Sequence, residues 1–458
     1  MDTATDFPVA LDRTSATPLS VQVAAALRRA TIAGDLRDGD RLPSSRALAA
    51  RLGVSRTVTA AAYEQLHAEG WTTTRHGAGT YVTAVPQLAP AQPSTPAADL
   101  EVAPLIDLAP GAPCVDVIDA AAWRRAWRAA AEGPQLVRPQ RDGLPAYRAA
   151  VSEHLLRHRG LSSAGIVFAT AGTSSAAAEI ATALFHPGDV VAMEEPGYAR
   201  SVGALRAAGM TVVPVPVDGK GLRIDAVPAT AKAVYCTPAH QYPLGGRMPA
   251  RRRVELIELA RRRDMLIIED DYDGELRYDA APLPLLAALG PDVVVHLGTT
   301  SKILTPTLGV GWMLAPAPVA RAVLALRECT GVRPSPAGQR LLVEFARTGD
   351  LSRHLRRLRR ELSERRAIVV DTLRAAGQHV VGDAAGSHVV LVLPSPAAES
   401  GLVAAARASG VQLDSLARHH IGEPATFGIP IGYTACTRAE LECALAVIVE
   451  CVTDDRRP

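Results

Sequence analysis

A proline- and alanine-rich stretch divides this chain into two parts. Residues 84–104, AVPQLAPAQPSTPAADLEVAP, contain five prolines, no glycine and no aromatic residue. This composition favours an extended, semi-rigid linker over an element that packs into a core. The sequence therefore predicts a small domain over residues 1–83 and a large domain over residues 105–458. The 458 residues suffice for two separate cores.

The remaining composition argues against several classes of protein. No stretch approaches the ~18 apolar residues that a membrane helix needs. The acidic N-terminus MDTATDFPVALDR lacks the basic and then apolar pattern of a signal peptide. The six cysteines form no C-x-x-C pair and no histidine-flanked cluster, so neither disulfides nor a structural zinc site are expected. We expect a cytoplasmic protein with no bound metal and no membrane partner.

The small domain shows the pattern of a helix-turn-helix followed by a β-hairpin. Apolar residues recur at helical spacing over 18–33, and a short helix is predicted over 46–52. A second short helix is predicted over 55–68, with Ser55 as its N-cap. Two β-rich arms around a glycine-containing turn follow over 71–82. A hairpin at this place predicts a wing.

A local excess of arginine marks one part of this domain. No acidic residue lies between Asp40 and Glu64, whereas four arginines do, at positions 41, 46, 51 and 56. Phosphate contacts need such a positive surface, and base recognition needs polar side chains at the start of the second helix. Ser55, Arg56 and Thr57 occupy that place. The alternative is a solvated three-helix interaction module whose arginines are incidental.

The segment LPSSRALAARLGVSRTVTAAAYEQLHAEGW, continued by RHGAGTYV, resembles the winged helix of the GntR family of bacterial regulators over residues 15–83. The resemblance implies a domain that binds a double-stranded DNA operator. Together with the charge pattern, it gives the residues expected to contact DNA as Arg46, Ser55, Arg56, Thr57, His76 and Gly77.

Lysine is scarce in this chain, which directs attention to tasks that arginine cannot perform. Only Lys220, Lys232 and Lys302 stand against 46 arginines. A lysine amine can lose its proton and form a Schiff base, whereas arginine stays protonated. Lys302 follows the run VVVHLGTTS, just beyond the carboxyl end of a predicted strand, where ligands bind in parallel α/β sheets. Beside these hydroxyls, Lys302 suits a Schiff base to pyridoxal phosphate (PLP).

A second motif supplies the acid that such a cofactor requires. The run MLIIEDDYDGELRY (265–278) predicts a buried strand that emerges into acids and a tyrosine. PLP needs a carboxylate to keep its pyridine nitrogen protonated, and it benefits from a phenol beside its ring hydroxyl. Asp270 and Tyr272, two residues apart on an extended chain, point to the same side. A divalent-metal site is the alternative interpretation of the acidic cluster.

Two further segments offer groups for an aromatic, phosphorylated ligand. ATAGTSS (169–175) follows a predicted strand and opens an alanine-rich helix, so Gly172 and Thr173 would lie at a helix N-terminus that binds anions. In EEPGYAR, Tyr198 falls in a turn after a strand, where its ring would stack on a cofactor, with Arg200 two residues further on.

Together these motifs resemble fold-type I aminotransferases. The whole arrangement, from about residue 10 to 455, resembles the MocR-like regulators, which join a GntR-type winged helix to such a domain. The resemblance implies an α/β fold with a large mixed sheet, a smaller C-terminal subdomain and a homodimer. It implies that Lys302 binds PLP, Asp270 pairs with the pyridine nitrogen, Tyr272 contacts the ring hydroxyl and Tyr198 stacks. The phosphate would lie near Gly172, Thr173, Thr299 and Ser301.

Two positions depart from the family pattern. The arginine that usually grips the PLP phosphate, seven residues after the lysine, is replaced by Gly309. Loss of such a charged hydrogen bond costs about 1.5–3 kcal/mol, or roughly ten- to a hundredfold in affinity. The arginine that usually holds an amino-acid carboxylate near the C-terminus is replaced by Pro430. Arg200 is the remaining nearby candidate for binding an effector.

Three functions follow from this combination. The leading hypothesis is a DNA-binding transcriptional regulator that binds PLP on Lys302 and senses PLP or a related ligand without turnover. One alternative is an active PLP-dependent aminotransferase with an accessory DNA-binding domain. The other is a DNA-binding regulator that has lost PLP and senses a different ligand. The loss of a substrate carboxylate clamp argues against catalysis, because poor positioning of a substrate lowers the rate severely.

Overall fold

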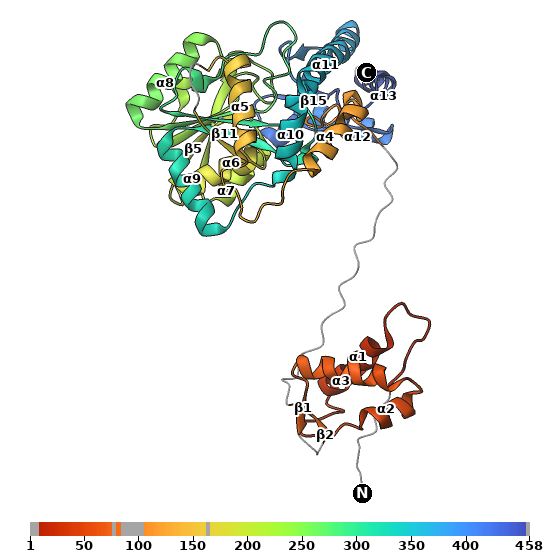
Figure 1. Ribbon diagram of the computed structural model, residues 1–458. Coiled ribbons are helices and arrows are strands. Elements are labelled where there is room, and N and C mark those ends of the chain that lie inside the picture. The colour runs from red at the N-terminus through yellow and green to blue at the C-terminus, as the bar shows by residue number, and fades with distance from the viewer. Residues whose placement is uncertain (1–8, 76–78, 84–104, 162–164, 455–458) are drawn as a thin grey trace. The chain divides into compact units, whose positions relative to one another are not determined.

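The computed structural model describes residues 9–75, 79–83, 105–161 and 165–454 (Figure 1). The chain divides into two compact units, Met1–Glu101 and Val102–Pro458. The linker expected at 84–104 lies outside the described residues, as do His76 and Gly77 of the expected wing. Those expectations stay predictions.

The first unit places two short helices in succession after a longer one. Ser44 Oγ accepts a hydrogen bond from the Ala47 N–H (3.2 Å) at the start of α2, and Ser55 Oγ accepts one from Val58 (3.4 Å) at the start of α3. Gly53, with φ of 61°, turns the chain between them, a conformation that favours glycine. The helices are α1 (Leu19–Ala33), α2 (Ser45–Leu52) and α3 (Arg56–Ala68).

A hairpin of β1 (Thr72–Arg75) and β2 (Gly79–Val82) completes this unit. Its first arm begins at Thr72 and not at Trp71, because the Trp71 N–H donates to the Leu66 carbonyl (2.9 Å) and closes the end of α3. The core contains Val23, Leu27, Leu36, Leu48, Ala62, Leu66 and Val82. The helix-turn-helix predicted from the sequence is confirmed.

The second unit is built on an eight-stranded sheet of order β4-β11-β10-β9-β8-β5-β6-β7. Neighbours from β10 to β6 run parallel, whereas β11, β4 and β7 add antiparallel edges. The strands are β4 (Ile166–Thr170), β5 (Val190–Glu195), β6 (Thr211–Asp218), β7 (Gly221–Leu222), β8 (Ala231–Cys236), β9 (Leu266–Asp271), β10 (Val294–Thr299) and β11 (Gly311–Ala315).

Helices cover both faces of this sheet, so its central strands β9 and β10 are buried along almost their whole length. One core joins the sheet to α6, α7 and α9, and another joins it to α5 and α8. The helices are α4 (Ala120–Ala131), α5 (Pro145–His158), α6 (Thr173–Leu184), α7 (Ala199–Ala207), α8 (Ala250–Arg263), α9 (Ala317–Thr330) and α10 (Pro336–Arg347).

The 26-residue helix α11 (Asp350–Ala375) leads into a smaller C-terminal subdomain. A three-stranded sheet of order β12-β13-β15 forms its centre, and β14 pairs with β3 from the start of the unit. The elements are β3 (Ile106–Asp107), β12 (Val380–Val381), β13 (His388–Leu393), α12 (Pro396–Ala408), β14 (Val411–Gln412), β15 (Phe427–Gly432) and α13 (Arg438–Asp454). Among the described residues, no helix has the length and apolar character needed to span a membrane.

Candidate functional site

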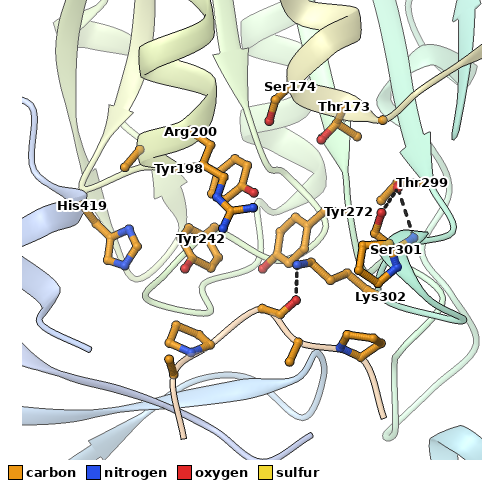
Figure 2. Close-up of a pocket in the computed structure, with 18 of the residues that line it drawn as sticks. Thr173, Ser174, Tyr198, Arg200, Tyr242, Tyr272, Thr299, Ser301, Lys302 and His419 are labelled. Atoms are coloured by element: carbon orange, nitrogen blue, oxygen red, sulfur yellow. Dashed lines mark hydrogen bonds between the residues drawn. The ribbon is translucent and has the colours of Figure 1, made fainter. Parts of the chain in front are cut away.

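A cavity of about 650 Å³ lies at the carboxyl ends of the parallel strands (Figure 2). The loop 107–113, the first turn of α6 and the segments after β5, β9 and β10 line it. Eight of the nine ligand-binding residues predicted from the sequence are among the lining residues: Gly172, Thr173, Tyr198, Arg200, Tyr272, Thr299, Ser301 and Lys302. Asp270, the ninth, is buried behind them.

Lys302 lies in the turn that follows β10. Its Nζ donates to the carbonyl oxygen of Gly111 in the loop 107–113 (2.5 Å; Figure 2). Gly111 has φ of 110°, a conformation that favours glycine, and a Cβ there would lie only 3.2 Å from Nζ. Burial lowers the pKa of Lys302, although Asp273 and Asp270 act in the opposite direction. A lowered pKa makes the neutral, nucleophilic amine more accessible.

Asp270, in β9, is 2% exposed. Its Oδ2 accepts a close hydrogen bond from the Tyr235 hydroxyl of β8, whereas its Oδ1 is buried and has no hydrogen-bond partner among the described residues. Burial raises the pKa of Asp270 to about 7, although the Tyr235 and Thr173 hydroxyls lower it. A buried carboxylate with one free oxygen is suited to a cationic partner such as a protonated ring nitrogen.

The Tyr272 hydroxyl belongs to a buried polar cluster. It lies 3.0 Å from Nδ1 of His240, and the same nitrogen lies 2.8 Å from Oδ2 of Asp273. A Cβ on Gly386 would come within 2.2 Å of the His240 ring, so the imidazole occupies a slot that only glycine leaves open. His240 was not predicted from the sequence, since nothing in its local sequence shows that it lies beside Tyr272.

The acidic residues at and after the end of β9 contact different partners. Asp271 pairs with Arg159 (2.5 Å), and Asp273 contacts His240 instead. In the described part of the chain, no group of three or more His, Cys, Asp or Glu residues is arranged to hold a metal ion.

The first turn of α6 offers backbone N–H groups to the cavity. Gly172 occupies the N-cap position with φ of 147° and has no side chain to cap the helix. Thr299 Oγ1, which lies near this turn, donates to Ser301 Oγ (2.9 Å; Figure 2). An uncapped helix N-terminus facing hydroxyl groups is suited to an anion.

The other end of the cavity is aromatic and polar. Tyr198 meets Tyr242 edge to face at 5.4 Å between ring centroids, and Arg200 extends beside them (Figure 2). His419 is 3% exposed, and neither ring nitrogen has a hydrogen-bond partner among the described residues. Burial lowers the pKa of His419 to about 3, so its imidazole is neutral at pH 7. Tyr242 and His419 were not predicted, because no cofactor motif contains them.

Four of the six residues predicted to contact DNA lie at the start of two helices, and the other two, His76 and Gly77, are outside the described residues. Arg46 is the second residue of α2, Ser55 caps α3, and Arg56 and Thr57 are its first two residues. All four are exposed. An exposed helix N-terminus with these side chains has the geometry of a recognition helix.

Comparison with protein families matches both units. Residues 19–82 match the bacterial regulatory proteins of the gntR family, and residues 103–448 match aminotransferase class I and II. The HTH-type pyridoxine biosynthesis transcriptional regulator PdxR of Corynebacterium glutamicum is 35% identical over 98% of this chain and 99% of its own. The probable rhizopine catabolism regulatory protein MocR of Rhizobium meliloti is 31% identical over 92% and 91%.

This chain is a MocR-type regulator of the GntR family. Its fold class is confirmed as an α/β protein with an N-terminal helix-turn-helix and a fold-type I aminotransferase domain. Pyrococcus horikoshii kynurenine aminotransferase superimposes with a TM-score of 0.72, over 78% of this chain and 93% of that one. At 23% identity this likeness concerns the fold alone.

In this MocR-type chain, the two departures from the family pattern lie in different surroundings. Gly309 has φ of 57°, and a Cβ there would meet nothing within 4 Å. Pro430 is buried in the edge strand β15, opposite Val390 of β13. An edge strand tolerates proline, because one side of its backbone has no ladder to join. At position 309, by contrast, the open space around the missing Cβ would accommodate a longer side chain.

Proposed function

We propose that this MocR-type chain is a cytoplasmic DNA-binding transcriptional regulator that binds PLP through Lys302 and senses PLP or a related ligand without turnover. The supporting observation is the convergence of Lys302, Tyr272, Tyr198 and the first turn of α6 on one cavity, beside the buried carboxylate of Asp270. The name of the C. glutamicum relative, a regulator of pyridoxine biosynthesis, also supports an effector related to PLP.

The ring end of the cavity fits PLP. Asp270 Oδ1, buried and unpartnered, would accept a hydrogen bond from the protonated ring nitrogen. Tyr272 would contact the ring hydroxyl, and the ring of Tyr198 would stack on the pyridine. When bound, PLP supplies an aldehyde that reacts with an amine and a ring that withdraws electrons. Lys302, whose pKa burial lowers, is the amine placed to react.

The phosphate end fits less tightly. The N-terminus of α6 at Gly172 and Thr173, with the hydroxyls of Thr299 and Ser301, would hold the phosphate by backbone and hydroxyl hydrogen bonds. A guanidinium at position 309 would add a charged bidentate contact, and glycine cannot supply it. We expect reversible cofactor binding, which is what a sensor of PLP concentration requires.

Absence of turnover follows from the substrate side. With Pro430 in place of the usual arginine, two arginines among the described residues line the cavity, Arg200 and Arg418. Arg418 is paired with Asp414 (2.7 Å), which leaves Arg200 as the one placed to bind a substrate or effector carboxylate. A single contact fixes position poorly, and catalysis depends steeply on position. Arg200 would therefore contribute to effector binding and not to transamination.

The winged helix would deliver the response. Arg46, Ser55, Arg56 and Thr57, together with His76 and Gly77, would contact the operator through phosphates and base edges. A homodimer of the large domain would present two such units to a repeated or inverted pair of half-sites. Ligand-induced change in the dimer would then alter how both half-sites are contacted.

An absorption titration with PLP tests the cofactor part, with wild type measured beside Lys302→Ala. A saturable band that only the wild type shows is expected if Lys302 binds the aldehyde. Lys302→Arg serves as the matched control, because it keeps the charge but cannot react. No band in any of the three proteins would favour a regulator that senses another ligand.

A further inference from the structure

A chain of four hydroxyl and carboxyl groups runs behind the cavity. Tyr235 donates a close hydrogen bond to Asp270 Oδ2, and its hydroxyl lies 2.8 Å from Ser201 Oγ. Ser201 Oγ lies 3.3 Å from Ser174 Oγ in the first turn of α6. The chain therefore joins the carboxylate at the ring end to the helix turn at the phosphate end, through β9, β8, α7 and α6.

Pairing with a protonated ring nitrogen would favour the ionised form of Asp270, and that form fixes the direction of this chain. An ionised Asp270 only accepts hydrogen bonds, so Tyr235 must donate to it. The Tyr235 oxygen then accepts from Ser201, and the Ser201 oxygen accepts from Ser174. Burial and the neighbouring Asp270 raise the pKa of Tyr235 well above its usual value, so its proton stays in place.

Tyr235 and Ser201 have no direct access to a ligand. Tyr235 is 1% exposed and Ser201 is fully buried, and neither lines the cavity. Any effect that they have on ligand binding must therefore pass through Asp270 or Ser174. Because Tyr235 engages Oδ2, the oxygen of Asp270 that is left without a partner is Oδ1.

We infer that Tyr235 is a positioning residue that holds Asp270 by one oxygen and presents the other to the ring nitrogen of the cofactor. Through Ser201 it also links this carboxylate to Ser174, so the two ends of the cofactor are bound cooperatively. This inference rests on the proposed function, because it assumes that PLP is the ligand.

The test compares PLP with its carbocyclic analogue, in which CH replaces the ring nitrogen, on the full-length protein. Tyr235→Phe removes the hydroxyl and keeps the ring. We expect the dissociation constant for PLP to rise about ten- to a hundredfold, the effect of losing a hydrogen bond to a charged group. The dissociation constant for the analogue should change less than twofold, since it has no nitrogen for Asp270 to hold.

Ser201→Ala provides the second variant, because it interrupts the chain without touching Asp270. We expect a several-fold weakening for PLP. If the hydrogen-bonded chain acts as a unit, the double variant Tyr235→Phe/Ser201→Ala should bind PLP no more weakly than Tyr235→Phe alone. Independent, additive effects would overturn the cooperative link.

The remaining outcomes separate the possible failures. Equal weakening for PLP and for the analogue would show that Tyr235 merely supports the structure, and unchanged binding of both would show that it has no role. Either result overturns the inference while the proposed function stands. Failure of the wild-type protein to bind PLP at all would remove the proposed function, and the inference with it.

Discussion

The part of the cavity that would hold the cofactor ring has the residues expected of the family, whereas the parts that would hold charged groups lack theirs. At the ring end, Lys302, Asp270 and Tyr272 are all present, and a buried layer of Tyr235, His240 and Asp273 supports them. Where the phosphate and a substrate carboxylate would bind, Gly309 and Pro430 replace the two arginines that are usual in the family. A site that recognises the cofactor ring but holds charged groups loosely suits ligand sensing better than rapid catalysis.

The largest effect is expected at the ring end, from Asp270→Asn. Burial raises the pKa of Asp270 to about 7 in the folded protein, whereas this carboxyl titrates near pH 4 in the unfolded chain. Between these two pH values, the folded protein binds a proton that the unfolded chain has released. Its contribution to stability is therefore complete below about pH 4 and is lost as the pH rises to about 7. At pH 8, Asp270→Asn should stabilise the PLP-free protein by up to about 4 kcal/mol.

Thermal unfolding of both proteins between pH 5 and pH 8 measures this difference. Glu194 also has its pKa raised to about 7, chiefly by burial and last by Asp270, so most of its contribution is common to both proteins. The same variant should weaken PLP binding at least tenfold. Equal slopes of stability against pH in the two proteins would mean that the pKa of Asp270 is not raised in the folded protein.

The second effect concerns the helix-turn-helix unit, whose contacts with DNA should not depend on the residues of the cavity. Arg56→Ala is expected to weaken specific DNA binding by about 1–3 kcal/mol and to leave the PLP titration unchanged. Arg29, exposed on α1, gives a matched control as Arg29→Ala. A gel-shift titration on operator DNA decides the matter, and an unchanged Arg56→Ala result would exclude this contact.

An arginine at position 309 should make the phosphate end of the cavity bind PLP more tightly, and so reduce its difference from the ring end. Gly309→Arg is expected to tighten PLP binding about tenfold. The gain from a charged contact is about 1.5–3 kcal/mol, and tenfold is the low end of that range. The left-handed backbone at 309 costs about 1–2 kcal/mol of folding stability, which the PLP-free and PLP-bound protein share.

The control is Gly309→Ala, which carries the backbone cost without the charge. Pyridoxal, which lacks the phosphate, should bind Gly309→Arg no better than it binds Gly309→Ala. An equal gain for pyridoxal and PLP would show that the new arginine does not act on the phosphate.

The smallest effect is expected from Arg200→Gln. Arg200 lies beside Tyr198 and Tyr242, away from the first turn of α6 (Figure 2). The dissociation constant for PLP alone should therefore change less than threefold, as measured by absorption titration. A loss of more than tenfold would mean that Arg200 has taken over the role of the missing phosphate arginine.

Much of this organisation could be predicted from the sequence, because its signals are local. The helix cap at Ser55 and the lysine at a strand end depend on neighbours along the chain. His240 and Tyr235 could not be assigned roles in this way, since their partners are more than 30 residues away. The loop contact between Gly111 and Lys302 spans 191 residues and depends on the folded topology.

The central claim is that the cavity binds PLP without sustained turnover. The most direct measurement follows product formation by the PLP-loaded protein with a common amino acid and 2-oxoglutarate, in the same sample that shows the saturated absorption band. We expect a saturable band that depends on Lys302 and no product beyond one equivalent of the protein. Many turnovers in that sample would contradict it and identify the chain as a working aminotransferase with a DNA-binding domain.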